Sequence, residues 1–298
     1  DRPTFLHLSG FIQRMPPRAF DAQLVSNVMN SFAKAEIRDP RLFDHIAVAV
    51  VQLNIPLEAQ SVALILNACA RLEYVNAALL ERVLAAARGL DPGDFGAQHV
   101  DNVLNALARL EVADRPMLEH MARVTVELPP SDFDARAVAI VMNAFARLLA
   151  PAHPLTMRVF GHLSTKVVPW VALDSPIVVG VILNALAKAE VRDDALLRRL
   201  AAALHDKVLH DNVQLEPKNL VHIYHAFATL YVVDRRLIAR LDATLVECSH
   251  ADFEPSEVAV IAWSVGVLQT RNVAVVDWLL EGLDAHLPSL ADISMQQA

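Results

Sequence analysis

The chain has 298 residues, of which 54% are hydrophobic, only 6% are aromatic and 8 are glycine, a composition that suits packed helices better than a β-sandwich. Its formal net charge of −8 and pI of about 5.8 argue against a simple basic nucleic-acid binder. Two cysteines, Cys69 and Cys248, cannot build a disulfide framework. The longest apolar stretches, 177–183 and 258–267, fall short of the roughly 20 residues that a membrane helix needs.

A short pattern, Asn-Ala-x-Ala-Lys/Arg, recurs along the chain. Good copies begin at Asn30 (with Ser31 in place of Ala), Asn67, Asn105, Asn143 and Asn184, and weaker copies begin at His225 and Trp263. The intervals between these seven positions are 37, 38, 38, 41, 41 and 38 residues. Self-similarity with this period indicates a repeat architecture in which each unit is one supersecondary element.

An apolar residue marks the start of the first helix of each unit, which we call helix A. An apolar residue stands ten residues before the pattern, with one copy a place further back: Phe20, Leu57, Phe95, Phe133, Leu173, Leu215 and Phe253. Prolines 176, 217 and 255 lie early in their segments, where a helix tolerates proline. We therefore expect a helix of about 15 residues that contains the pattern.

A second helix, helix B, is marked nine residues after the start of each pattern. The residues there are Asp39, Asn76, Asp114, Ala152, Asp193, Asp234 and Asn272. Six of the seven are types whose side chains cap helix N-termini, and apolar pairs follow in most units at helical spacing. Each unit is thus predicted to be a helix–turn–helix, with a second helix of about 12 residues.

One such hairpin cannot bury its apolar faces alone, so the units must stack. The predicted fold is all-α, a right-handed α-solenoid of about seven repeats of 37–41 residues. A single repeat domain is expected over 16–290, with an N-terminal extension over 1–15 and a tail over 291–298. The extra residues of the two longer intervals are expected in loops near 167–174 and 210–216, with no domain boundary there.

The Asn-Ala-x-Ala-Lys/Arg core, the capped second helix and the period together resemble the heptatricopeptide/octatricopeptide class of organellar helical repeats, over roughly residues 15–290. Related units occur beside RAP domains and in the Fas-activated serine/threonine kinase family, and this chain shows no RAP-like region. The resemblance implies a protein of the mitochondrial matrix, after removal of a targeting peptide that the sequence does not contain. It also implies contact with RNA, in some members as a structural part of the mitochondrial ribosome.

The candidate RNA-binding residues are the cations four residues after each pattern start: Lys34, Arg71, Arg109, Arg147 and Lys188. In stacked repeats, equivalent positions lie about one helix diameter, ~10 Å, apart and could contact successive phosphates. A second interpretation stays open: the same side chains could offset the helix dipole and pair with Glu36, Glu73, Glu111 and Glu190, two residues on. Because the sixth and seventh repeats have Thr229 and Val267 instead, any contact should be confined to the first five.

The asparagines could read bases, but each is embedded in an apolar run and is expected to bond turn backbone. His222 and His225 form a His-x-x-His pair without a further ligand nearby, so no metal is expected. No phosphate-binding loop, dinucleotide turn or nucleophile elbow occurs.

The sequence therefore predicts a non-enzyme without cofactor, membrane segment or small-molecule substrate. Its expected partners are rRNA, through the basic ladder, and other proteins of a large complex, in a mitochondrial ribosome. The alternatives are a protein–protein scaffold in another organellar complex, or an organellar RNA-processing or stability factor.

Overall fold

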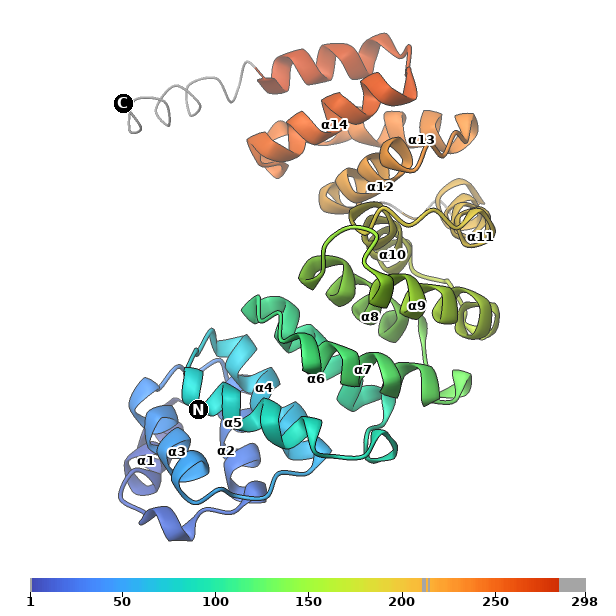
Figure 1. The fold of residues 1–298 in the computed structure, drawn as a ribbon. Coiled ribbons are helices and arrows are strands. Elements are labelled where there is room, and N and C mark those ends of the chain that lie inside the picture. Colours follow the sequence, from blue (N-terminus) through green and yellow to red (C-terminus); the bar gives the residue numbers. More distant parts are fainter. Residues whose placement is uncertain (1, 211–212, 214, 284–298) are drawn as a thin grey trace, which may run out of the picture. The chain divides into compact units, whose positions relative to one another are not determined.

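The computed structural model describes residues 2–210, 213 and 215–283, and all regular structure within these ranges is helical (Figure 1). The chain divides into two compact units, Asp1–Trp170 and Val171–Ala298. Each unit is a stack of helix pairs, which confirms the all-α solenoid prediction.

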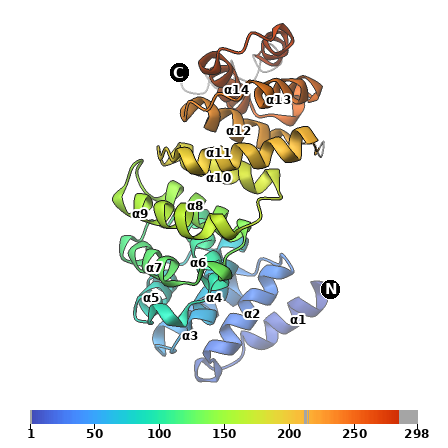
Figure 2. The same cartoon turned by 90° about the vertical axis from the view of Figure 1, so that its right-hand side faces the viewer.

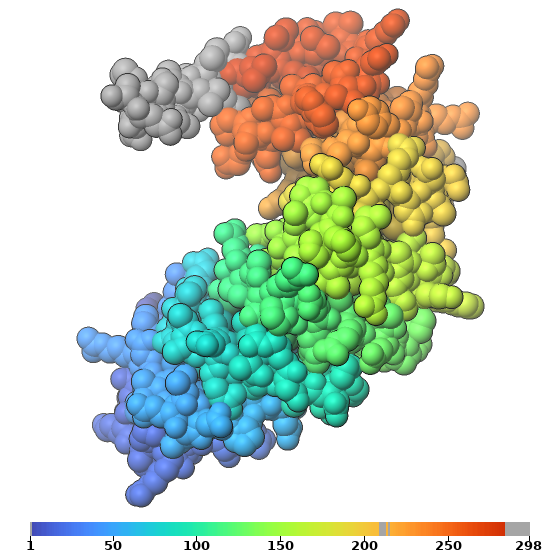
Figure 3. All heavy atoms as spheres, viewed as in Figure 1, coloured from blue at the N-terminus to red at the C-terminus, as the bar shows by residue number. Residues whose placement is uncertain are grey.

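The unit Asp1–Trp170 contains four helix pairs in two layers. The A layer consists of α2 (Ala22–Lys34), α4 (Ala59–Leu72), α6 (Ala97–Leu110) and α8 (Ala135–Leu148), and the B layer of α3 (Pro40–Gln52), α5 (Ala77–Arg88), α7 (Arg115–Glu127) and α9 (Pro154–His162). Each A helix packs mainly on the A helix of the next pair, and the B helices contact one another in the same order (Figures 1 and 2). Side chains close the space between successive helices of this unit on the face seen in Figure 3.

The unit Val171–Ala298 contains three pairs. Its A helices are α10 (Pro176–Lys188), α12 (Pro217–Thr229) and α14 (Pro255–Leu268), and its B helices are α11 (Asp194–His205), α13 (Arg235–Glu247) and a helix over 273–283. Again α12 packs between α10 and α14. The seven predicted repeats are therefore present in the described residues. That they form one continuous right-handed domain over 16–290 stays a prediction, and the tail at 291–298 lies outside the described residues.

The predicted caps start the B helices. Asp39, Asn76, Asp114, Asp193 and Asp234 each accept a hydrogen bond from the backbone N–H three residues on, at 2.7–3.1 Å. Asn272 accepts one from Ala274 at 3.2 Å. In the fourth repeat, where Ala152 cannot cap, the ring of His153 accepts the N–H of Leu155 instead.

The entry residues of the A helices are all buried, from Phe95 at 2% exposure to Leu173 at 9%. Short 3₁₀ turns precede four of the helices, at Pro17–Ala19, Pro92–Asp94, Pro130–Asp132 and His250–Asp252. The apolar side chain and the tight turn together fix where the incoming chain meets the first helical turn.

The turn between helices A and B has one geometry in six repeats. In the second, Glu73 adopts a left-handed conformation with φ of 52°, and the N–H of Tyr74 donates to the carbonyl of Cys69 at 2.9 Å. The corresponding left-handed residues elsewhere are Glu36, Glu111, Glu190, Tyr231 and Gln269. This is the Schellman closure of a helix C-terminus, made here without glycine.

Two features go beyond the repeat pattern that the sequence predicts. Residues 2–12, expected as an extension, form helix α1 (Arg2–Ile12), which contacts α3 and places Phe5 edge-on to Phe32 at a centroid distance of 5.0 Å. The extra residues of the longer repeats lie partly in helix, as π-helical segments Leu163–Val167 and Asp206–His210 that continue α9 and α11, with a 3₁₀ turn at Val168–Trp170. Because the hydrogen bonds of a π-helix span one residue more than those of an α-helix, these segments take up part of the added length. No helix in the described ranges is long and apolar enough to cross a membrane.

Candidate RNA-contact face

The A helices of Asp1–Trp170 present one polar face, which we call the polar A face. Its residues recur at spacings of seven and four along each helix and therefore lie on one side of it. They are Gln23, Asn30 and Lys34 on α2; Gln60, Asn67 and Arg71 on α4; Gln98, Asn105 and Arg109 on α6; and Arg136, Asn143 and Arg147 on α8.

Four cations of this face, Lys34, Arg71, Arg109 and Arg147, lie in the last turn of their A helices and are exposed, whereas Arg136 lies in the first turn of α8. Because α2, α4, α6 and α8 pack in sequence, Lys34, Arg71, Arg109 and Arg147 form one row. Lys188 occupies the same position on α10, in the other unit. The location at helix C-termini also lets each charge offset the helix dipole, as the second interpretation of these residues requires.

Two cations of the row pair with a glutamate of the preceding repeat. Arg71 does not pair with Glu73, the glutamate that follows two residues later in its own repeat. Arg71 lies 3.9 Å from the carboxylate of Glu36, and Arg147 lies 3.8 Å from that of Glu111. Glu36 and Glu111 are more than 80% exposed, so these long pairs contribute little to stability, about 0–1 kcal/mol each. They do lower the positive potential at Arg71 and Arg147.

The asparagines of the polar A face do not bond the turn backbone, so that prediction is wrong. Within the described residues, Asn30, Asn67, Asn105 and Asn143 hydrogen-bond no protein group, and their amide atoms are not enclosed. They are half-buried, with amides that reach the surface one helical turn before each cation. An amide in this position has both donors and acceptors available to a ligand.

A carboxyl group that sequence reasoning missed lies on the polar A face, about two helical turns before Arg109. Asp101 precedes Asn105 by one turn on α6, and its Oδ1 is enclosed without a partner. Burial and then the charge of Asp134 raise the pKa of Asp101 to about 6, while Arg136 opposes the shift. Only the packing of α6 against α8, which brings Asp134 and Arg136 close, creates this site.

The corresponding face of Val171–Ala298 has a different chemistry. Where the first unit has asparagines, α10 has buried Asn184, α12 has half-buried His225 and α14 has exposed Trp263. Burial and then the charge of Lys188 lower the pKa of both His225 and His222. No set of three or more His, Cys, Asp or Glu side chains that could hold a metal ion occurs in the described ranges.

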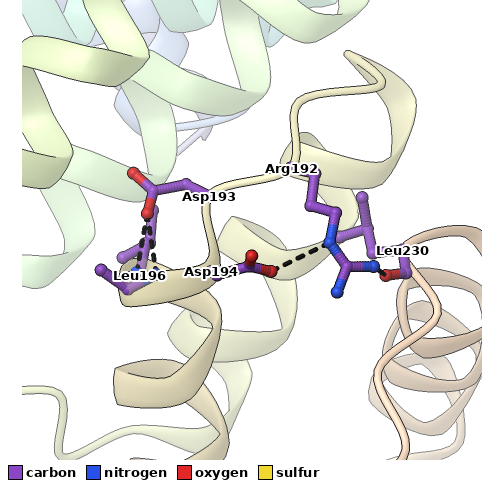
Figure 4. A network of polar contacts seen from close by, with 6 residues as sticks. Arg192, Asp193, Asp194, Leu196 and Leu230 are labelled. Carbon is purple, nitrogen blue, oxygen red and sulfur yellow. Dashed lines mark hydrogen bonds and ion pairs between the residues drawn. The ribbon is translucent and has the colours of Figure 1, made fainter.

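A groove beside the turn that joins α12 and α13 is a second surface feature of this unit. Arg192 pairs with Asp194 at 2.9 Å and donates to the carbonyl of Leu230, linking the turns of successive repeats (Figure 4). The groove is also lined by Arg198, His205 and the exposed side chains of Tyr231 and Val233. Its charges are mixed, and it resembles a protein-contact surface more than a phosphate site.

Comparison with known protein families supplies the identity of the chain. Residues 10–273, most of its length, match the family described as RNA-editing substrate-binding complex 6 protein, RESC6. At the level of individual curated proteins, no match reaches significance. The fold agrees with the helical-repeat part of the resemblance seen in the sequence, and the match gives no support to a RAP-domain or Fas-activated kinase relationship. The chain belongs to the RNA-editing substrate-binding complex 6 protein family.

Proposed function

We propose that this chain is a non-catalytic helical-repeat subunit of an RNA-editing substrate-binding complex in the mitochondrial matrix, and that its polar A face contacts single-stranded RNA directly. The family name supports an RNA-editing assembly, and nothing in the match supports the mitochondrial ribosome. The observation that carries direct contact is the row of Lys34, Arg71, Arg109 and Arg147, each one turn from an asparagine whose amide is open.

In the proposed contact, the row of cations and the row of asparagines bind different parts of the RNA. The cations take the phosphates, which position the strand without reading it, and the asparagine amides meet sugar or base edges. Glu36 and Glu111 compete with the phosphates for Arg71 and Arg147. Binding through four cations should therefore be moderate in affinity and dependent on salt, with a slope of log affinity against log salt of roughly −3 for a single strand.

The test compares two triple variants of equal charge. Arg71→Gln, Arg109→Gln and Arg147→Gln together remove most of the row, whereas Arg41→Gln, Arg115→Gln and Arg158→Gln remove three exposed arginines from B helices of the same unit. Titration of a single-stranded RNA at several salt concentrations should show at least a tenfold loss for the first variant and a slope reduced by about 2. The second variant should bind nearly as the parent does.

Equal binding by both variants would contradict the proposal. If the parent protein has no RNA affinity even at low salt, direct contact is excluded and a protein–protein adaptor remains. The exposed Tyr231 (72%) and Val233 (65%) at the groove favour that second function. It predicts that Tyr231→Ser with Val233→Ser releases a protein that co-purifies with the parent chain.

A further inference from the structure

Two aromatic side chains of successive A helices lie side by side in Val171–Ala298. The rings of His225 on α12 and Trp263 on α14 have centroids 6.0 Å apart and planes tilted by 43°. Trp263 is 50% exposed, so much of its indole faces the surface. Both residues occupy the repeat position that holds the open asparagines of the polar A face.

Among the residues that the structure describes, few side chains surround the exposed side of Trp263. Gly266, three residues on and therefore on the same side of α14, has no atom within 4 Å of the place a Cβ would occupy. Ala259, one turn before, is small and exposed. A flat ligand can therefore approach the exposed side of the indole without displacing a neighbouring side chain.

The charged side chain that acts on His225 is a lysine, and charges of both signs act on the neighbouring His222. Lys188 of α10 acts electrostatically on both His225 and His222, and Lys218 acts on His222. Glu257 of α14 is the acidic group that acts on His222, and its carboxylate is held by the backbone N–H of Glu254 at 3.0 Å. A ligand that combines a flat ring with negative charge matches this arrangement.

We propose that Trp263, backed by His225, is a stacking site for one nucleobase of single-stranded RNA, with Lys188 as the contact for an adjoining phosphate. The 6.0 Å spacing is that of a packed aromatic pair, so the base lies on the exposed face of the indole and not between the rings. Every base has a π-face, so such a site accepts any sequence. The inference rests on the RNA contact proposed above and extends it to the repeats that lack the Lys/Arg row.

The experiment separates stacking from charge by using two probes: a short uridine oligomer and a base-free ribose-phosphate oligomer of the same length. Trp263→Leu should lose about tenfold in affinity for the uridine oligomer and nothing for the base-free one. Trp263→Phe, which keeps a ring, should recover part of the loss. Trp170→Leu, which removes the other strongly exposed tryptophan (81%), is the matched control and should leave both affinities unchanged.

Quenching of tryptophan emission by the uridine oligomer supplies a second readout, present in the parent and the Trp170→Leu variant and lost in Trp263→Leu. Unchanged uridine affinity in Trp263→Leu, with the fold confirmed by its far-UV spectrum, overturns the stacking site. If the triple arginine variant loses affinity while Trp263→Leu does not, only this inference fails. A parent protein that binds neither oligomer overturns both proposals.

Discussion

The guanidinium of Arg82 on α5 donates a 2.7 Å hydrogen bond to the backbone carbonyl of Ile55, in the loop that leads into α4 of the same repeat. The same helix B position, six residues after the cap, recurs elsewhere. Arg199 donates to Val171 at 3.2 Å, the indole of Trp278 donates to Cys248 at 3.0 Å, and Nε2 of His45 lies 3.1 Å from the carbonyl of Met15. Each of these side chains ties the start of a repeat to its second helix.

Arg82→Met should test the importance of this tie. The substitution keeps much of the aliphatic contact but leaves the buried Ile55 without the guanidinium donor, so we expect destabilisation of about 1–3 kcal/mol in urea unfolding. Arg115→Met, which breaks only an exposed pair with Glu119, should cost less than about 1 kcal/mol. Equal losses of unfolding free energy in the two variants would show that the hydrogen bond from Arg82 to Ile55 stabilises the protein no more than an exposed ion pair does.

Asp101→Asn should stabilise the protein in a pH-dependent way. Because the folded-state pKa of Asp101 is raised to about 6, the folded form holds the proton more tightly, and stability falls as pH rises from about 4 through 6. At pH 7.5 the variant should gain about 1–2 kcal/mol, a value reduced for the partial exposure of the group. The gain should disappear near pH 4.

Urea unfolding at the two pH values measures the effect of Asp101→Asn. Asp174→Asn, which neutralises an exposed aspartate, serves as the comparison and should give no such difference. A gain of equal size at both pH values would show that the stabilisation does not come from removing the protonation equilibrium of Asp101.

Tyr224→Phe should destabilise the protein, because it removes one hydrogen-bond donor from the buried carboxylate of Asp242. Tyr224 donates to Asp242 at 2.6 Å, and Asn272 supplies the other contact at 3.4 Å. Burial raises the pKa of Asp242, and these bonds lower it, so losing the hydroxyl raises the pKa further. We expect a loss of about 1–3 kcal/mol at neutral pH that shrinks as the solution is acidified, because the protonated carboxyl is the form that burial favours.

Thermal unfolding of the Tyr224→Phe variant at pH 5 and pH 8 measures this loss. Tyr231→Phe removes a hydroxyl from an exposed side chain and should change little at either pH. A loss that is larger at pH 5 than at pH 8 would contradict the assigned direction.

Glu36→Gln combined with Glu111→Gln should strengthen RNA binding by a few fold at low salt. The two carboxylates lie within 4 Å of Arg71 and Arg147, and neutralising them leaves those cations to the phosphates. Glu81→Gln combined with Glu127→Gln, two exposed changes on α5 and α7, is the control of equal net charge. If both variants gain equally, the effect belongs to the overall charge of the protein and not to the row.

Sequence patterns predicted the parts of this structure that local chemistry determines. The caps at Asp39 and Asp114, the buried entry residues such as Phe95 and the row of cations all follow from residue type at fixed spacing. The left-handed turns were missed because glycine, the usual signal, is absent and Glu73 takes its place.

Other features depend on which helices pack together, and a single sequence does not contain that information. The raised pKa of Asp101 needs α8 beside α6, and the ties made by Arg82 and Trp278 need the loop folded back on helix B. The sequence suggested Glu73 as the partner of Arg71 because Glu73 is close in sequence. The actual partner, Glu36, becomes a neighbour only when the repeats stack. Trp263 is only a weaker copy of the sequence pattern, and its exposure depends on how α14 packs against its neighbours.

Helix α1 covers one flank of the first helix pair, with Phe5 against Phe32 of α2 and the hydroxyl of Ser9 donating to Asp39, the cap of α3. A fragment cut at residue 16, where the repeats begin in sequence, would leave that flank bare. Stacked units are self-complementary, so a bare flank is a template for another copy of the chain. Such a fragment should self-associate through this flank as its concentration rises, which sedimentation at several concentrations would measure.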